Sequence, residues 1–326
     1  MGGNMQSILP VLYSAIVIMT PLLFAATGGL FTELSGKLNI ALEGQLLIAC
    51  FFAIFAAYYT GSIAAGIAAA VLASVVLAAI IAFASLNLGS NVFIAGLAAN
   101  LLAGGLTIVL SQRFFNTRGV VSIRPAPVLP VIDIPFVKDI PIVGEILSGH
   151  TAYVYVSWVL LLFVWIAVYK TPFGYRLRAC GKHSQALVSL GIKPGVYHWT
   201  AFLLSGFFCG IGGSLLSLRI GGFVPNMTAG RGWIALVVIF LGMRRPLGIL
   251  LAAFVFGFAE SLSNYAQSFA LPPALVLAIP YVLTFFAIVF VSGRTDTGRA
   301  GILGKLAKLI CQTRVRGKAW RHKSTG

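Results

Sequence analysis

The sequence predicts an all-α integral membrane protein, a polytopic bundle of about nine transmembrane helices. Hydrophobic residues make up 59% of the 326 residues and charged residues only 9%, whereas soluble domains carry about a quarter charged residues. Apolar runs of about 20 residues, long enough to cross a bilayer as helices, recur along most of the chain. Apolar and polar residues do not alternate in these runs, as they do in the strands of a membrane β-barrel. Helices, which satisfy their own backbone hydrogen bonds, therefore account for the spans.

We expect nine spans, one of which is unusually short. In chain order they cover residues 9–30, 40–59, 63–84, 92–110, 152–169, 199–218, 233–242, 248–262 and 274–291. The segment 233–242 is too short to cross about 30 Å of hydrocarbon, so eight or ten spans are open alternatives. Glycines around Arg231 precede its apolar run, which fits either a plain short span or a broken helix of the kind found in transporters. Residues 1–292 are expected to form one transmembrane domain, followed by the tail 293–326.

The distribution of charge predicts how the chain is oriented in the membrane. The segment 170–198 carries five basic residues and no acidic one, and the tail 293–326 carries nine basic residues and one acidic residue. The proline-rich segment 111–151 is nearly balanced in charge. Because basic loops stay in the cytoplasm, we expect 170–198 and the tail inside, and the amino terminus and the loop 111–151 outside. We expect anionic lipids rather than nucleic acid as the partner of the basic tail.

Motifs for catalysis and for ATP binding are missing from the sequence. No Gly-x-x-x-x-Gly-Lys-Ser/Thr sequence is present, so the chain lacks the usual phosphate cradle for ATP. The four cysteines and four histidines show no metal-binding spacing. Only Glu43 and Glu260 are acidic within the expected spans, too few for the clustered acids and bases of a membrane enzyme. We therefore expect no enzyme activity, no metal and no cofactor in this chain.

Four motifs follow one another along the chain. The first, Asn-Ile-Ala-Leu-Glu-Gly-Gln at 39–45, opens the second span. The second is Gly-Ser-Asn at 89–91, with Asn100 further along the fourth span. The third is Thr-Pro-Phe-Gly-Tyr-Arg-Leu-Arg-Ala-Cys-Gly at 171–181. The fourth, 223–232, runs from Phe-Val-Pro to Gly-Arg-Gly before the short apolar segment.

In that order, the motifs resemble the permease subunits of bacterial ABC importers for simple sugars and nucleosides, of the type that includes branched-chain amino acid and ribose permeases. The resemblance runs from about residue 30 to 292. It implies that residues 1–292 form a permease domain in a bacterial inner membrane, and that this permease binds no ATP itself. It implies three kinds of partner: ATP-binding cassette subunits, a second, homologous permease, and an extracytoplasmic binding protein or lipoprotein that delivers the solute.

The resemblance also implies that the segment 171–192 is the cytoplasmic element that couples to the ATP-binding subunit. The residues agree with this, since a proline suits a helix start and a glycine permits close approach of two backbones. Its arginines suit acidic groups of a partner or lipid phosphate. The sequence departs from the family pattern at 182–184, where Lys-His-Ser stands in place of an acidic residue, Asn and Pro. The candidate coupling residues are Pro172, Gly174, Arg176, Arg178, Ala179, Gly181, Ala186 and Gly191.

Polar and aromatic residues in or beside the spans are candidates for the translocation pathway. A carboxylate inside the bilayer costs about 2.5 kcal/mol or more, so Glu43 is expected either to clamp two helices or to line a wet pathway. Asn39, four residues earlier, is expected on the same helical face. Glu260, close to a span end, is expected to be structural, and the glycines of 206–213 are expected to serve helix packing. The pathway candidates are Asn39, Glu43, Gln45, Asn91, Asn100, Phe223, Arg231 and Trp233.

The predicted solute is small and uncharged, and a nucleoside is preferred. The candidate amides suit neutral donors and acceptors, and aromatic rings can stack on a base. Riboflavin and a simple sugar are alternatives within the same importer class. A secondary transporter or channel that works alone is an alternative from another class, and a purely structural membrane protein is a third.

Overall fold

The computed structural model describes residues 2–123, 129–133, 143–267 and 282. Nearly all of these belong to one compact unit, residues 1–280. In the part of the chain that the structure describes, seven helices are long and apolar enough to cross a membrane. The prediction of an all-α polytopic membrane protein is confirmed. The expected span 274–291 and the basic tail lie outside the described residues, apart from residue 282, so the count of nine stays a prediction.

Helices make up most of the described chain. The long helices are α1 (Gly2–Leu34), α2 (Leu42–Thr60), α3 (Ile63–Ala82), α4 (Val92–Phe115), α7 (Ala152–Lys170), α9 (Pro194–Ile220) and α11 (Pro246–Ala266). A π-helical turn, η1 (Phe83–Asn87), continues α3. The shorter helices are α6 (Val143–Leu147), α8 (Pro172–Ser189) and α10 (Arg231–Leu241). α10 corresponds to the short expected span 233–242.

Several helices begin or end at residues that local chemistry selects, a few positions away from the hydropathy boundaries. α9 starts at Pro194 rather than at residue 199, because proline is favoured in the first turn of a helix. α4 continues past residue 110 to Phe115 and ends where Asn116 adopts a left-handed backbone with φ of 53°. The segment 111–151 therefore begins as helix.

α1 and α9 form the centre of the bundle. α9 packs against α1, α2 and α3, and α1 also packs against α11. A Cβ on Gly210 would lie 2.5 Å from the Cα of Val71 in α3, and one on Gly213 would lie 2.5 Å from the carbonyl oxygen of Leu46 in α2. The prediction that these glycines serve packing is confirmed.

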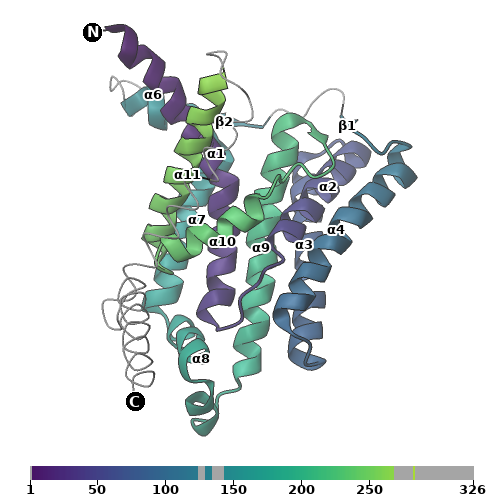
Figure 1. Ribbon diagram of the computed structural model, residues 1–326, viewed down its shortest axis with the longest axis vertical. Helices are drawn as coiled ribbons and strands as arrows, with labels where there is room; N and C mark the ends of the chain where they lie inside the picture. The colour runs from purple at the N-terminus through teal and green to yellow at the C-terminus, as the bar shows by residue number, and fades with distance from the viewer. Residues whose placement is uncertain (1, 124–128, 134–142, 268–281, 283–326) are drawn as a thin grey trace, which may run out of the picture. The chain divides into compact units, whose positions relative to one another are not determined.

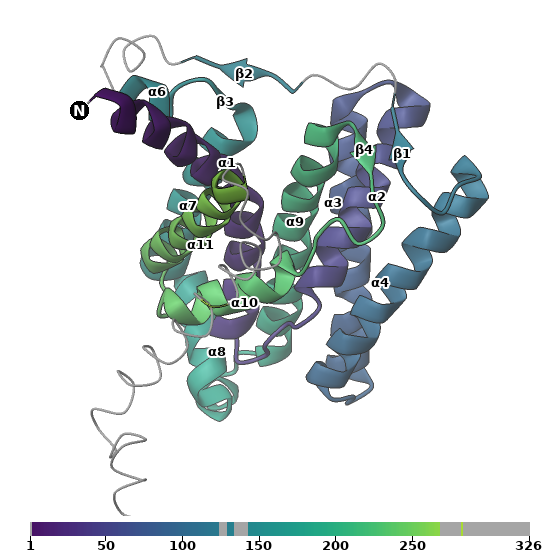
Figure 2. The same cartoon turned by 45° about the horizontal axis from the view of Figure 1, so that its top comes forward.

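Two short strand pairs lie at one end of the bundle. β2 (Val131–Ile132) pairs antiparallel with β3 (His150–Thr151) within the expected loop 111–151. β1 (Val121–Ser122) pairs antiparallel with β4 (Gly222–Phe223), which joins this loop to the segment before α10. Figures 1 and 2 show these strands at the end opposite α8, with α10 lying crosswise between the two ends.

Candidate functional site

The start of α2 is set by Asn39, which lies in the non-helical stretch between α1 and α2. The Asn39 side-chain oxygen accepts a hydrogen bond from the backbone N–H of Ala41 at 3.0 Å. Such a local bond competes with helix formation, and α2 begins only at Leu42. The expectation that Asn39 and Glu43 share one helical face is therefore wrong, because Asn39 precedes the helix.

Glu43, in the first turn of α2, binds the start of α10. Its Oε1 accepts hydrogen bonds from the Thr228 hydroxyl at 2.6 Å and from the Gly230 N–H at 2.9 Å. Its Oε2 accepts one from the Gly232 N–H at 2.7 Å. A carboxylate here satisfies amide groups that the first turn of α10 leaves unpaired and interacts favourably with the helix dipole. Of the two roles expected for Glu43, this geometry is that of a clamp between helices.

The segment that leads into α10 has a strained backbone. Asn226 and Ala229 adopt left-handed conformations with φ of 59° and 46°, which costs a non-glycine residue about 1–2 kcal/mol. Gly232 lies directly against the backbone of Glu43, and no Cβ fits between them. The bonds from Glu43 therefore hold a strained segment in close contact with α2.

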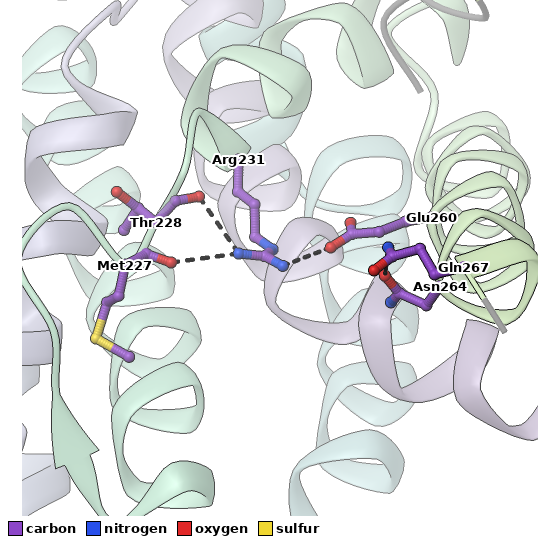
Figure 3. A network of polar contacts seen from close by, with 6 residues as sticks. All are labelled: Met227, Thr228, Arg231, Glu260, Asn264 and Gln267. Carbon is purple, nitrogen blue, oxygen red and sulfur yellow. Dashed lines mark hydrogen bonds and ion pairs between the residues drawn. The ribbon is translucent and has the colours of Figure 1, made fainter. Parts of the chain in front are cut away.

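Arg231 faces the other way, toward α11 (Figure 3). Its Nη2 donates to Glu260 Oε1 at 2.5 Å, and its Nη1 donates to the carbonyl oxygens of Met227 and Thr228 at 3.3 and 3.5 Å. The side chains of Arg231 and Glu260 are 22% and 29% exposed. The pair thus links the start of α10 to α11 while keeping access to its surroundings, and the contact fits the structural role expected for Glu260.

A polar cluster of Asn39, Gln45 and Ser205 ties the non-helical stretch to α2 and α9. Asn39 Nδ2 donates to Ser205 Oγ at 2.9 Å and to Gln45 Oε1 at 3.2 Å. Ser205 Oγ donates to the same Gln45 oxygen at 3.1 Å. All three residues are fully buried. This cluster is sealed inside the bundle in the conformation described.

Asn100 and Asn91 lie on α4 and have different surroundings. Asn100 Oδ1 accepts from the Gly44 N–H at 2.7 Å, and its Nδ2 donates to the Ile40 carbonyl oxygen at 3.1 Å. Asn91 caps α4, accepting from the Phe93 N–H at 2.8 Å, and is exposed. Asn100 thus supports the start of α2, whereas Asn91 lies at the end of the bundle that holds η1.

The two aromatic candidates are also separated. Phe223 is fully buried in β4, with its ring edge-on to Phe51 at 5.4 Å between centroids. Trp233, in the first turn of α10, is 41% exposed. The structure therefore brings Glu43 and Arg231 together at the start of α10, places Asn39 and Gln45 in the buried cluster, and leaves Trp233 facing outward.

α8 follows α7 through a tight corner. The Thr171 hydroxyl accepts a hydrogen bond from the Gly174 N–H at 3.3 Å and so caps α8. Gly174 lies directly on the carbonyl oxygen of Val168, and Gly181 lies directly on that of Leu34, with no space for a Cβ at either position. These glycines hold α8 against α7 and α1.

The arginines of α8 are held by aromatic residues of the same chain. Arg176 Nη1 donates to the Tyr197 hydroxyl at 3.3 Å. The Arg178 guanidinium lies 4.8 and 5.0 Å from the ring centroids of Tyr169 and Tyr175, within the range of cation–π attraction. Arg176 is exposed and Arg178 is half-buried on α8, which begins at Pro172 and includes the half-buried Ala179.

A kink divides α8 at His183, where the backbone has φ of −148° and ψ of 70°. The kink coincides with the sequence 182–184, where the chain departs from the family pattern. Beyond it Ala186 is exposed, and Val188 and Leu190 are 60% and 75% exposed. Gly191 then ends the helix in the left-handed conformation, with φ of 74°. The end of α8 thus presents apolar side chains outward.

The sequence did not single out several residues that the structure brings into these regions. They are Thr228 before α10, Ser205 in the buried polar cluster, and Val188 and Leu190 at the end of α8. Thr228 carried no local signal, because it does not cap α10 but donates its hydroxyl to the distant Glu43. Ser205 carried none, since its partners depend on how α9 packs. Among the described residues no group of His, Cys, Asp and Glu is arranged to hold a metal ion.

Comparison with known proteins agrees with this architecture. The family model described as "Branched-chain amino acid transport system / permease component" matches residues 11–288. The guanosine ABC transporter permease NupQ of Bacillus subtilis is 32% identical, over 88% of this chain and 93% of its own length. The nucleoside ABC transporter permease NupC of Lactococcus lactis is 29% identical, over 87% and 93%. The putative glucose ABC transporter permease TsgC13 of Haloferax volcanii is 27% identical, over 89% and 94%.

No solved structure gives a significant match. The family match covers most of the chain. The apolar helices of the chain, together with this family, are those of a multi-pass inner membrane protein. The relatives are transport proteins rather than enzymes. The chain therefore belongs to the family of branched-chain amino acid transport system permease components and is the permease component of an ABC importer.

Proposed function

We propose that this permease carries nucleosides across the inner membrane. The observation that carries the proposal is that a guanosine permease and a nucleoside permease match 88% and 87% of the chain. The half-length α10, with uncharged amides nearby and an ion pair at its start, supports it, since transporters place such helices beside the solute. The predicted preference for neutral, hydrogen-bonding solutes agrees with these relatives.

A simple sugar is the second candidate solute. The putative glucose permease matches 89% of the chain at 27% identity, which favours a sugar less strongly than the two nucleoside relatives favour a nucleoside. Riboflavin is the remaining alternative of this class. Because the chain belongs to an ABC permease family, the alternative of a transporter that works alone is set aside.

Within the proposal, the predicted pathway residues divide into two groups. Arg231 and Trp233 are partly exposed near the start of α10 and are assigned to the solute pathway. The second group stabilises the packing around α10 and α2, because its polar atoms or rings make contacts within the chain. Its members are Asn39, Glu43, Gln45, Asn100 and Phe223. Asn91 is assigned to neither group, since it caps α4 at the end of the bundle.

We assign α8 to docking on an ATP-binding subunit. ABC importer permeases work with ATP-hydrolysing subunits and a substrate-binding protein. Exposed apolar side chains at Tyr175, Val188 and Leu190, beside Arg176, suit a partner with an apolar patch and acidic residues. We therefore propose that α8 lies in the cytoplasm and that the strand pairs and the amino terminus lie outside. A second, homologous permease and an extracytoplasmic binding protein or lipoprotein complete the proposed importer.

Uptake in cells that express the complete importer, with and without this subunit, tests the nucleoside proposal. Labelled uridine, guanosine, ribose and riboflavin are supplied in parallel, and a plasmid copy of the subunit serves as the rescue control. Loss of uridine and guanosine uptake, restored by the plasmid, is the expected result. Loss of ribose uptake alone would show that the solute is a sugar and would contradict the proposal.

A further inference from the structure

Arg231 and Glu260 form an ion pair whose side chains remain partly exposed. Ionised side chains inside a membrane are costly unless they are paired or face a wet cavity. Glu43 meets this requirement by using both of its oxygens within the chain. Arg231 and Glu260 keep 22% and 29% of their side chains exposed. The surroundings of the pair must therefore supply water, a solute or another polar group.

Within the part of the chain that the structure describes, one carboxylate oxygen of Glu260 has no hydrogen-bond donor. Its Oε1 receives the Arg231 guanidinium at 2.5 Å, whereas no described residue donates to its Oε2. Asn264, one turn further along α11, is exposed, and its Oδ1 accepts a long hydrogen bond of 3.5 Å from Gln267. No described residue accepts from its Nδ2. Figure 3 shows Asn264 and Gln267 beside Glu260 on α11. Among the described residues, an oxygen of Glu260 without a donor thus lies one helical turn from an amide group of Asn264 without an acceptor.

We propose that Glu260 and Asn264 bind the vicinal diol of a sugar ring, with Arg231 as the positioning residue for the carboxylate. An ionised carboxylate is a strong acceptor for hydroxyl groups, and an amide N–H₂ donates to a hydroxyl or ring oxygen. Arg231 fixes Glu260 through Oε1 and leaves Oε2 for the solute. This inference rests on the proposed function and deepens it, because it assigns the ribose, rather than the base, as the part of a nucleoside that is read here.

A second ion pair in the molecule provides a matched control. Arg244 Nε lies 2.8 Å from Glu33 Oε1, and it joins the last turn of α1 to the loop between α10 and α11. The pair has the same chemistry but lies away from α11 residues 260 and 264. Glu33→Gln therefore reports the effect of losing an ion pair without touching the proposed diol site.

The test is uptake by the complete importer, with its binding protein, reconstituted in liposomes. KM and Vmax are measured for uridine, 2′,3′-dideoxyuridine, ribose and 2-deoxyribose. Because the binding protein stays the same, a change in selectivity between wild type and variant belongs to the permease. Glu260→Gln is expected to lower the uridine-to-dideoxyuridine preference about tenfold, as expected for loss of one charged hydrogen bond. Asn264→Ala is expected to lower it about threefold, and Glu33→Gln is expected to leave it unchanged.

Equal loss of uridine and dideoxyuridine uptake in Glu260→Gln and Asn264→Ala would show a structural role and overturn the inference. If the Glu260→Gln variant fails to assemble, the uridine-to-dideoxyuridine preference is measured instead for Asn264→Ala and for the double variant R231Q/E260Q. A lowered preference supports the diol site, and an unchanged preference contradicts it. A wild-type importer that carries ribose but no nucleoside overturns the nucleoside proposal alone, and the ribose-to-2-deoxyribose ratio then tests the diol site. A wild type that carries neither overturns both.

Discussion

The junction between α2 and α10 and the helix α8 both hold residues that the sequence marked as candidates. At the junction polar groups point into the protein, whereas on α8 apolar groups point out of it. At the junction, Glu43 and Asn100 turn their polar atoms inward and bind backbone groups of the same chain. On α8, Val188 and Leu190 turn apolar side chains outward. A group that is satisfied within the chain holds the fold, whereas a group left open at the surface needs a partner. The two regions should therefore respond differently to substitution.

The largest expected effect comes from Glu43→Ala, which removes the inward contacts of the junction. Three donors, the Thr228 hydroxyl and the N–H groups of Gly230 and Gly232, would lose their acceptor at a partly buried site. We expect a loss of about 2–5 kcal/mol in the free energy of unfolding. This is less than the sum for three fully buried donors at about 1–3 kcal/mol each, because the hydrogen bonds are only partly buried. Titration with SDS, followed by the far-UV circular dichroism of the detergent-solubilised chain, measures this loss.

Glu43→Gln serves as the matched variant for that experiment. The amide keeps one acceptor oxygen, so its loss of stability should be clearly smaller than that of Glu43→Ala. If both variants are as stable as the wild type, the clamp assignment for Glu43 is wrong.

A smaller effect, on coupling rather than stability, is expected from the double variant V188S/L190S on α8. Exposed positions usually change stability by no more than about 0.5 kcal/mol. Burying two apolar side chains in an interface stabilises it by at least about 1 kcal/mol, which corresponds to about fivefold in affinity. We therefore expect ATPase activity stimulated by the loaded binding protein to fall at least about fivefold at limiting ATP-binding subunit.

Val120→Ser is the control, because Val120 is 62% exposed near β1, at the end opposite α8. Unchanged stimulation in V188S/L190S would count against docking at the end of α8. Gly174→Val is a less informative test, although it should abolish transport. Its side chain would collide with the carbonyl oxygen of Val168 and displace the whole of α8.

The smallest effect concerns His150 in β3, a buried group at the end of the molecule that holds the strand pairs. Burial lowers the pKa of His150 below its ordinary value, and the hydrogen bond to the Ile146 carbonyl oxygen opposes this shift. The carbonyl can only accept, so Nε2 carries the proton, and Nδ1 has no partner among the described residues. Protonation would therefore add a buried N–H without an acceptor.

The sign of the pH dependence follows from this. The unfolded chain takes up a proton near pH 6.5, before the folded chain does, so stability is full above about pH 6.5 and falls as the pH is lowered. We expect a loss of at most about 1.4 kcal/mol per pH unit, measured by SDS titration between pH 5 and 8. His150→Gln should flatten this slope, and an identical slope in the variant would exclude His150 as its cause.

The sequence alone determined the fold class, the seven long spans and the position of the half-length helix. Lipid tails form no hydrogen bonds, so long apolar runs must fold as helices wherever they lie in the final bundle. The sequence also marked α8 through Pro172, Gly174 and its arginines, because the chemistry of a helix start and a close backbone contact is local. In the same way Arg231 and Glu43 stood out as charges within apolar segments.

Only the tertiary structure decided what those charges contact. Glu43 and Gly230 are separated by 187 positions in the chain, and nothing in their local sequence specifies that α10 crosses the bundle at the start of α2. The placement of Asn39 failed for a related reason: its bond to Ala41 competes with helix formation, and the contact with Ser205 that favours it arises only when α9 packs there. Local patterns fix the elements, whereas contacts between distant segments decide which polar groups are satisfied and which remain open for a solute or a partner.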